Sequence, residues 1–259
     1  MKIAITGKGG VGKTTLSAIL SHLYAAEGKR VIAVDADPDA NLAQALGVSP
    51  AEIEKLRPIA DMADLIEERT GAKPGTIGSV FKMNPKVDDL PEEIGYKIDG
   101  ITLLLMGKAK TASSGCYCPE NVLLKQLLKH LVVERDEIVI ADMEAGIEHM
   151  TRGTSEAVDA FIVVVEPGQR SIQTANTVKE MAKGLGVKKV FFVANKIRTD
   201  ADIEFLKSNI KDVQFLGALR FNQSLMDSDI KGISPFHGSP EAVAQVKEIK
   251  LQLDAFALK

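Results

Sequence analysis

A glycine-rich run that ends in a lysine and a threonine carries the clearest chemistry in the sequence. It reads Gly7-Lys8-Gly9-Gly10-Val11-Gly12-Lys13-Thr14 and matches G-x-x-x-x-G-K-[ST] in full. Glycines let the backbone curl until successive N–H groups point at one anion, and a helix that follows adds its positive end. We therefore expect a nucleoside triphosphate to bind here, with Lys13 on the outer phosphates and the Thr14 hydroxyl on Mg²⁺. The remaining contacts are expected from Gly9, Gly10, Val11, Gly12 and Thr15.

The segments on either side place this loop between a strand and a helix. Residues 2–6 form a short β-like run, and residues 15–27 have a helical pattern. Strand-like and helix-like segments alternate through the rest of the chain, and no linker divides it. The sequence predicts an α/β fold: a single P-loop NTPase domain over residues 1–259, with a mostly parallel twisted sheet and helices on both faces.

Apolar runs typical of buried parallel strands mark the sheet, and helical patterns lie between them. The predicted strands are Ile3–Thr6, Val31–Val34, Ile101–Met106, Ile138–Ala141, Phe161–Val165, Val190–Ala194 and Phe215–Ala218. The predicted helices are Thr14–Glu27, Pro119–Leu131, Ser171–Leu185, Asp202–Ile210 and Pro240–Phe256. Residues 49–100 look like an insertion that is helical near 59–70 and otherwise loop. The last helix is expected to pack on the core rather than bind a membrane.

Composition excludes several functional classes. The chain has 259 residues, of which 45% are hydrophobic and 26% charged, as in a globular protein. Its net charge of −3 leaves no basic footprint for nucleic acid. No apolar run reaches the roughly 18 residues of a membrane span, and the first strand leaves no room for a cleavable signal. We expect a cytoplasmic protein without nucleic-acid or membrane partners, whose two cysteines form no disulfide framework.

The extra lysine near the start of the loop makes it resemble the deviant P-loop ATPases. In that family this lysine reaches across a dimer interface to the ATP of the partner. The resemblance implies that ATP joins two copies of the chain into a homodimer, in which Lys8 supports hydrolysis. The alternative is that Lys8 is a solvated loop lysine.

Two aspartates follow the second predicted strand, at the edge where parallel strands place the mouth of a ligand crevice. The family pattern implies that Asp37 lies in switch I and orients the attacking water. Asp35 would support the Mg²⁺ and the loop. For Asp39 and Asn41, which follow in the same segment, the alternative to a role at the site is that they cap the next helix.

Residues 138–146 resemble a Walker B strand that ends in switch II. The resemblance implies that Asp142 holds Mg²⁺ through water and that the backbone N–H of Gly146 senses the γ-phosphate. Many relatives read Asp-x-Pro-Ala-Gly here, whereas this chain has Met143-Glu144. His149 follows on the same element and could relay a proton or bind a metal, with a structural role as the alternative.

Residues 191–196 resemble the strand end that recognises adenine in this family. The carboxamide of Asn195 can both donate to the base and accept from it. Lys196 reads alternatively as a plain surface residue.

Two cysteines one residue apart, Cys116 and Cys118, could bind one metal ion, because alternate residues of an extended segment share a face. Thiolates suit nickel, zinc, copper(I) or iron–sulfur units. Two ligands do not complete a tetrahedral site, but the pairs of two subunits would supply four. The alternative is two small buried side chains.

Several motifs together resemble the accessory ATPases of carbon monoxide dehydrogenase and acetyl-CoA synthase, the CooC type within the MinD-like family. They are Asn84-Pro85-Lys86-Val87-Asp88, Cys116-Tyr117-Cys118-Pro119-Glu120-Asn121, Asp142-Met143-Glu144-Ala145-Gly146-Ile147-Glu148-His149 and Thr151-Arg152-Gly153. The resemblance implies a nickel chaperone that hydrolyses ATP, forms an ATP- and metal-dependent homodimer, and serves one of those two enzymes. Its cofactors would be ATP, Mg²⁺ and Ni²⁺, and Zn²⁺ can substitute for Ni²⁺.

Two other functions stay open at this point. An iron–sulfur redox ATPase, like the nitrogenase iron protein, also bridges its dimer with a metal cluster, although its cysteines lie far apart in sequence. A spatial-organising ATPase of the MinD or ParA kind shares the loop, but the acidic chain and its last helix argue against it.

Overall fold

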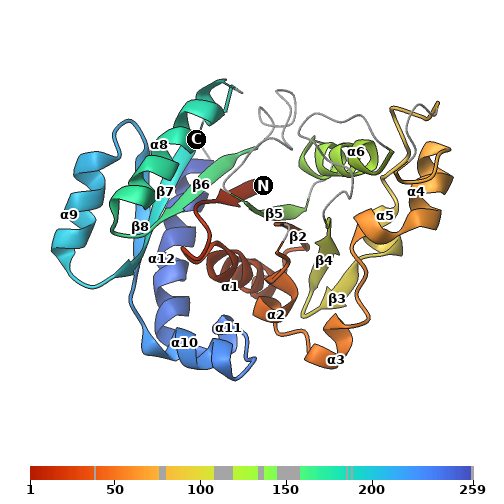
Figure 1. Ribbon diagram of the computed structural model, residues 1–259. Coiled ribbons are helices and arrows are strands. Elements are labelled where there is room, and N and C mark those ends of the chain that lie inside the picture. Colours follow the sequence, from red (N-terminus) through yellow and green to blue (C-terminus); the bar gives the residue numbers. More distant parts are fainter. Residues whose placement is uncertain are drawn as a thin grey trace.

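An eight-stranded sheet forms the centre of the computed structural model (Figure 1), which describes residues 1–37, 39–75, 80–107, 119–133, 137–144, 158–184, 186–187 and 189–257. The strands lie in the order β3-β4-β2-β5-β1-β6-β7-β8. Their bounds are β1 (Lys2–Thr6), β2 (Val31–Ala36), β3 (Tyr96–Ile98), β4 (Ile101–Leu105), β5 (Ile138–Met143), β6 (Ala160–Val165), β7 (Val190–Ile197) and β8 (Gln214–Arg220). All neighbouring pairs are parallel except β3 and β4. The predicted α/β fold is confirmed.

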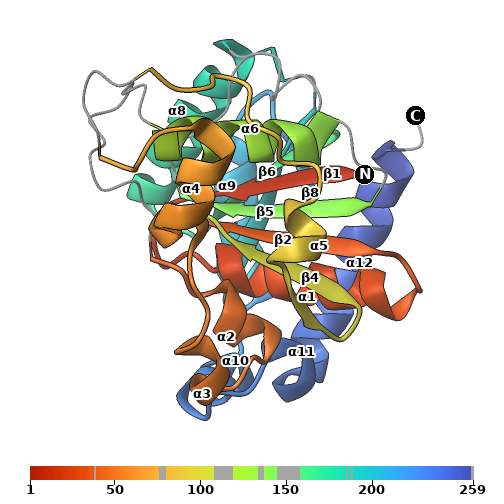
Figure 2. The ribbon, with the colours of Figure 1, turned by 90° about the vertical axis from the view of Figure 1, so that its right-hand side faces the viewer.

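Helices cover both faces of this sheet (Figure 2). On one face lie α4 (Ala63–Thr70), α6 (Pro119–Val133), α8 (Gln169–Gly184) and α9 (Asp200–Asn209). On the other lie α1 (Lys13–Ala26), α2 (Leu42–Leu46) and α12 (Pro240–Ala257). The described shorter helices are α3 (Pro50–Ile53), α5 (Leu90–Glu93), α10 (Gln223–Ile230) and α11 (Pro235–Gly238), with a 3₁₀ turn at Ile59–Asp61.

Side-chain alternation along the strands fills two separate core layers. In β1, Ile3 and Ile5 pack toward α1 and α12, whereas Ala4 faces the layer of α6 and α8. Each strand of a parallel sheet covered on both faces must be apolar on both sides, which explains the continuous apolar runs in the sequence. The largest fully buried side chains include Phe161 and Phe192.

The last helix packs in the core, as predicted. Val246, Ile249 and Leu253 of α12 are buried at helical spacing against the sheet. Among the described helices, none combines the length and the apolar character that a bilayer span needs.

The insertion at residues 49–100 is more ordered than the sequence analysis predicted. A loop was expected up to residue 100, but Tyr96–Ile98 pairs antiparallel with Ile101–Leu105 as an edge hairpin. Asp99 and Gly100 form its turn with φ of 47° and 78°, the conformation that an Asp-Gly turn favours. The three-residue strand was too short to stand out as an apolar run, and the Asp-Gly pair was its one available signal.

A half-buried arginine joins the helical parts of the insertion. The Arg69 guanidinium of α4 donates to both oxygens of Asp89 at 2.9 and 3.0 Å and to Glu93 of α5 at 2.7 Å. These bonds hold α4 and α5 together, and α4 packs in the same core layer as α6.

Candidate nucleotide-binding site

Three glycines let the loop between β1 and α1 fold tightly against its neighbours. Gly7, Gly10 and Gly12 have φ of 149°, 78° and 96°, where a side chain causes strain. A Cβ on Gly7 would collide with the backbone oxygen of Val164 in β6, and one on Gly12 with the amide of Asn195 at β7. The loop therefore lies pressed against the ends of two further strands.

Two buried carboxylates lie side by side next to the loop. The parallel register of β2 and β5 sets Asp35 directly opposite Asp142. Each is about 1% exposed. Burial raises the pKa of Asp35 to about 7 and that of Asp142 to about 6, since water no longer solvates their charges.

The oxygens around Asp142 suit a magnesium ion. The Thr14 hydroxyl donates to Asp142 Oδ2 at 2.7 Å, while the buried Oδ1 has no hydrogen-bond partner in the described structure. Hard divalent cations prefer this combination of carboxylate and hydroxyl oxygens. The two residues predicted to hold Mg²⁺ are thus in contact. The ion would balance the negative charges of the two carboxylates.

Asp35 also fixes the chain that follows β2. Its Oδ2 accepts from the N–H of Leu42 at 2.9 Å, and its Oδ1 accepts from the N–H of Asp37 at 3.3 Å. Asn41 stands at the N-cap position of α2 without making a side-chain capping bond. The capping alternative for Asn41 is therefore wrong, because Asp35 takes the first free N–H of the helix.

An internal ion pair links the loop to the segment after β2. Lys13 Nζ lies 3.5 Å from Asp37 Oδ2, and the two side chains are 6% and 17% exposed. Lys13 was predicted to bind the outer phosphates, and Asp37 was predicted to orient the attacking water. Lys8 is half-buried, and no hydrogen bond or ion pair joins its side chain to a described residue.

Asn195 contacts the loop rather than standing free. Its Nδ2 donates to the Val11 carbonyl at 2.7 Å, and its Oδ1 accepts from the N–H of Lys196 at 2.8 Å. A carboxamide has two donors and two lone pairs, so one of each remains. Its reading of adenine stays a prediction.

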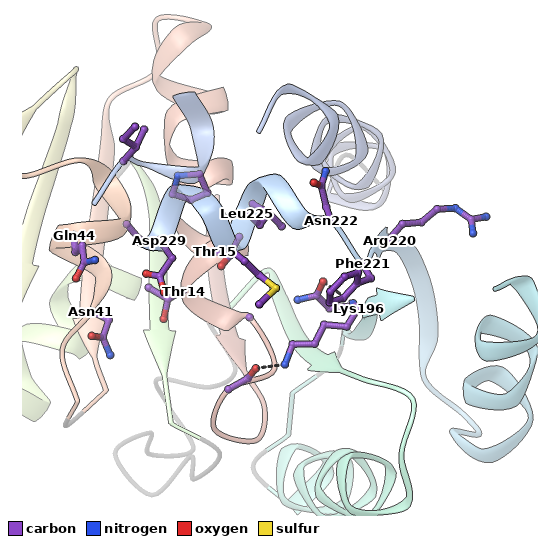
Figure 3. A pocket seen from close by; sticks show the side chains of 17 residues that line it. Thr14, Thr15, Asn41, Gln44, Lys196, Arg220, Phe221, Asn222, Leu225 and Asp229 are labelled. Atoms are coloured by element: carbon purple, nitrogen blue, oxygen red, sulfur yellow. Dashed lines mark hydrogen bonds between the residues drawn. The ribbon is translucent and has the colours of Figure 1, made fainter. Parts of the chain in front are cut away.

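A cavity of about 600 Å³ opens at this edge of the sheet (Figure 3). The loop residues Gly10, Gly12, Thr14 and Thr15 line one part of it. The far wall comes from the end of β8 and from α10, with Arg220, Phe221, Asn222, Leu225 and Met226. Sequence reasoning missed this wall because α10 has only a weak apolar pattern. Asn222, which caps α10 through the N–H of Ser224, was the available signal.

Several predicted residues lie outside the described part of the chain: Cys116, Cys118, Gly146 and His149. Glu144 of the unusual switch II sequence is described. Its side chain is exposed, and its carbonyl accepts from Thr6 Oγ1 at 2.7 Å. This bond ties the end of β5 to the start of the loop.

Comparison with known proteins assigns the family. The CobQ/CobB/MinD/ParA nucleotide binding domain matches residues 2–236. Over 93% of the chain and 91% of the relative, the sequence is 47% identical to the carbon monoxide dehydrogenase accessory protein CooC of Rhodospirillum rubrum. The chain belongs to this family as a CooC-type, MinD-like member.

A further sequence relative and a solved structure are similar to the chain. An uncharacterised ATP-binding protein of Methanocaldococcus jannaschii is 46% identical over 96% of both chains. The MinD subunit fold of the Aquifex aeolicus MinC:MinD complex matches with a TM-score of 0.67 at 20% identity, covering 98% of this chain and 96% of that one. Family membership makes the chain a nucleotide-binding domain, and the cavity at the loop stays the predicted site for the nucleotide.

Replacing Asp37 by Asn should tighten ADP binding by about 3- to 10-fold, because Lys13 would no longer be held by a carboxylate that the phosphates must displace. Isothermal titration calorimetry with Mg²⁺-ADP measures this. Asp39→Asn is the matched control, since it makes the same charge change two residues away at an exposed position. Equal gains in both variants would show a general charge effect instead.

The buried carboxylates should make the nucleotide-free protein less stable as the pH rises from about 4 to about 7. In this window Asp35 stays protonated in the folded state but ionises in the unfolded chain, where its pKa is about 3.9. The folded state then binds more protons, so the free energy of unfolding falls with pH. Urea unfolding at several pH values measures it.

The matched comparison for this pH dependence is Asp142→Asn, which removes one of the two neighbouring charges. Its decline in unfolding free energy should be shallower than that of the unchanged protein. Burial lowers the pKa of His22, so this residue makes the free energy of unfolding rise with pH. That contribution is the same in both proteins and cancels in the comparison. Identical slopes in the two proteins would contradict the account.

Proposed function

We propose that the chain is an ATP-hydrolysing nickel chaperone that assists nickel insertion into the metallocluster of carbon monoxide dehydrogenase or acetyl-CoA synthase. The observation that carries the proposal is the 47% identity to the accessory protein CooC, which extends over 93% of this chain. The nucleotide site supports it, because the predicted phosphate and Mg²⁺ residues meet at one edge of the sheet.

Nickel is the cargo, and Cys116 and Cys118 are the proposed ligands. Two subunits would supply four thiolates between them, with Zn²⁺ as a competing ion. The helix α6 begins at Pro119, directly after Cys118. Its buried leucines pack in the same core layer as Ala141 and Met143, which flank Asp142 in β5. A change at the Mg²⁺ site could thus be transmitted through packed side chains to α6, the helix that follows the two cysteines in the sequence.

The ion pair between Lys13 and Asp37 suggests how ATP would start the cycle. The incoming phosphates take Lys13 from Asp37, which frees the carboxylate to orient the attacking water. Thr14 and Asp142 would hold Mg²⁺, which neutralises charge on the phosphates. Lys8, whose side chain makes no hydrogen bond or ion pair with a described residue, would reach the ATP of a second copy and complete a homodimer. Hydrolysis then loosens the dimer and releases nickel to the client.

A spatial-organising role rests on weaker support. The likeness to solved MinD structures is at 20% identity and concerns the fold alone. Val246, Ile249 and Leu253 of α12, which a membrane-binding tail would expose, are buried against the sheet.

Replacing Lys8 by Ala should leave the affinity for ATP within about twofold but reduce hydrolysis by at least a hundredfold, because a charge that acts across the dimer contributes to the transition state rather than to binding. Calorimetry and a phosphate-release assay measure the two effects. Lys29→Ala, at an exposed lysine beyond α1, serves as the control. Parallel loss of binding and hydrolysis would contradict the trans-acting role.

The same variant tests the function. Nickel-free carbon monoxide dehydrogenase, incubated anaerobically with limiting Ni²⁺, ATP and the unchanged chain, should gain activity well above the level reached with Ni²⁺ alone. Lys8→Ala should give no gain beyond that level. Full activation by Lys8→Ala would show that hydrolysis does not drive the transfer, and the absence of any activation by the unchanged chain would overturn the proposal for this client. Nickel-free acetyl-CoA synthase is assayed in parallel.

A further inference from the structure

A lysine at the end of β7 holds the outer side of the phosphate-binding loop. Lys196 Nζ donates to the carbonyl of Gly10 at 2.7 Å (Figure 3) and pairs with Glu166 Oε2 at 3.0 Å. Glu166 follows β6, and its own N–H donates to Ser171 Oγ in α8 at 3.0 Å. The contact therefore joins the loop to the ends of two strands and the start of a helix.

The backbone at Lys196 has an uncommon shape that aims this side chain. Its φ is +57°, in the left-handed region where lysine is rarely found. The register between β7 and β8 shifts at the same place, between Ala194 and Ile197. Strained backbone is retained mainly where the surrounding structure requires it, which often occurs at functional sites.

Together Lys196 and Asn195 anchor two consecutive carbonyls of the loop. Lys196 donates to the carbonyl of Gly10, and Asn195 donates to the carbonyl of Val11, each at 2.7 Å. In a trans peptide the C=O and the N–H point in opposite directions. Anchoring the Val11 carbonyl outward thus turns the N–H of Gly12 toward the interior of the loop, where phosphate oxygens bind.

We propose that Lys196 is a positioning residue for the nucleotide: anchored by Glu166, it keeps the Gly10–Val11 turn in its phosphate-binding shape. The inference rests on ATP binding at this site, as in the proposed function, but not on nickel or on a client. Lys196 also lines the cavity, so direct contact with a phosphate is the competing role.

Three variants separate these roles. Lys196→Met keeps the aliphatic stem and removes the donors, Lys196→Arg keeps a charged donor, and Glu166→Gln removes the charge of the anchor. The matched control is Lys207→Met, at a lysine of similar exposure in α9 that pairs with Glu204 at 3.4 Å, away from the loop. Equilibrium titration gives the Kd for Mg²⁺-ATP and Mg²⁺-ADP, and thermal unfolding without nucleotide gives Tm.

Lys196→Met should weaken ATP and ADP by similar factors of about 5- to 10-fold, because both nucleotides use the same loop N–H groups. Glu166→Gln should weaken both by about 2- to 3-fold, and Lys196→Arg should recover the original affinity to within about twofold. A double variant that combines Lys196→Met with Glu166→Gln should have the same affinities as Lys196→Met alone, since the two residues act through one contact. Lys207→Met should leave both affinities unchanged.

Three results would overturn the proposal. A lower Tm of Lys196→Met with unchanged affinities would give the lysine a purely structural role. Weaker binding in Lys196→Met with unchanged or tighter binding in Glu166→Gln would make Lys196 a direct phosphate ligand. Glu166 would then only compete with the phosphate for this lysine. Nucleotide affinity is measured apart from client activation, so failure of the nickel function leaves this result standing. Absence of ATP binding by the unchanged chain would overturn both.

Discussion

Two carboxylates buried side by side beside the phosphate-binding loop are the constraint on which the site depends. The register of β2 and β5 leaves Asp35 and Asp142 opposite each other in an apolar sheet. Charges in such a place are costly unless cations or donors meet them. Backbone N–H groups satisfy Asp35, and the Thr14 hydroxyl satisfies one oxygen of Asp142. The remaining oxygen has no hydrogen-bond partner in the described structure, and a divalent cation would suit it.

Residues that are expected to contact a magnesium nucleotide also contact one another. Asp37 lies where phosphate charge is expected and pairs with Lys13. Thr14 donates to Asp142, although its hydroxyl is expected to face Mg²⁺. Binding of a magnesium nucleotide would replace both contacts at once. The residues released, Asp37 after β2 and Asp142 at the end of β5, stand at the starts of the two segments that the family pattern calls switches.

Much of this site could be predicted from the sequence because it depends on local patterns. The glycine spacing predicted the loop, and apolar runs predicted seven of the strands, whose ends then brought Asp35 and Asp142 to one edge. The hairpin at Asp99 and Gly100 carried a local signal that was overlooked. The cavity wall at Phe221 and the hydrogen bond from Lys196 to Gly10 could not be predicted. Both join segments far apart in the sequence and depend on where β7 and β8 end.

The central claim is that a nucleotide switch controls a soft-metal site shared by two copies of the chain. Anaerobic Ni²⁺ titration with light scattering, with and without ATP, tests it on the unchanged chain and on the Cys116→Ala/Cys118→Ala variant. The account predicts one metal ion per dimer, a dimer strengthened by ATP, and loss of the metal but not of ATP binding in the variant. Unchanged nickel binding by the variant would contradict the account and leave a CooC-type ATPase without a thiolate site for its cargo.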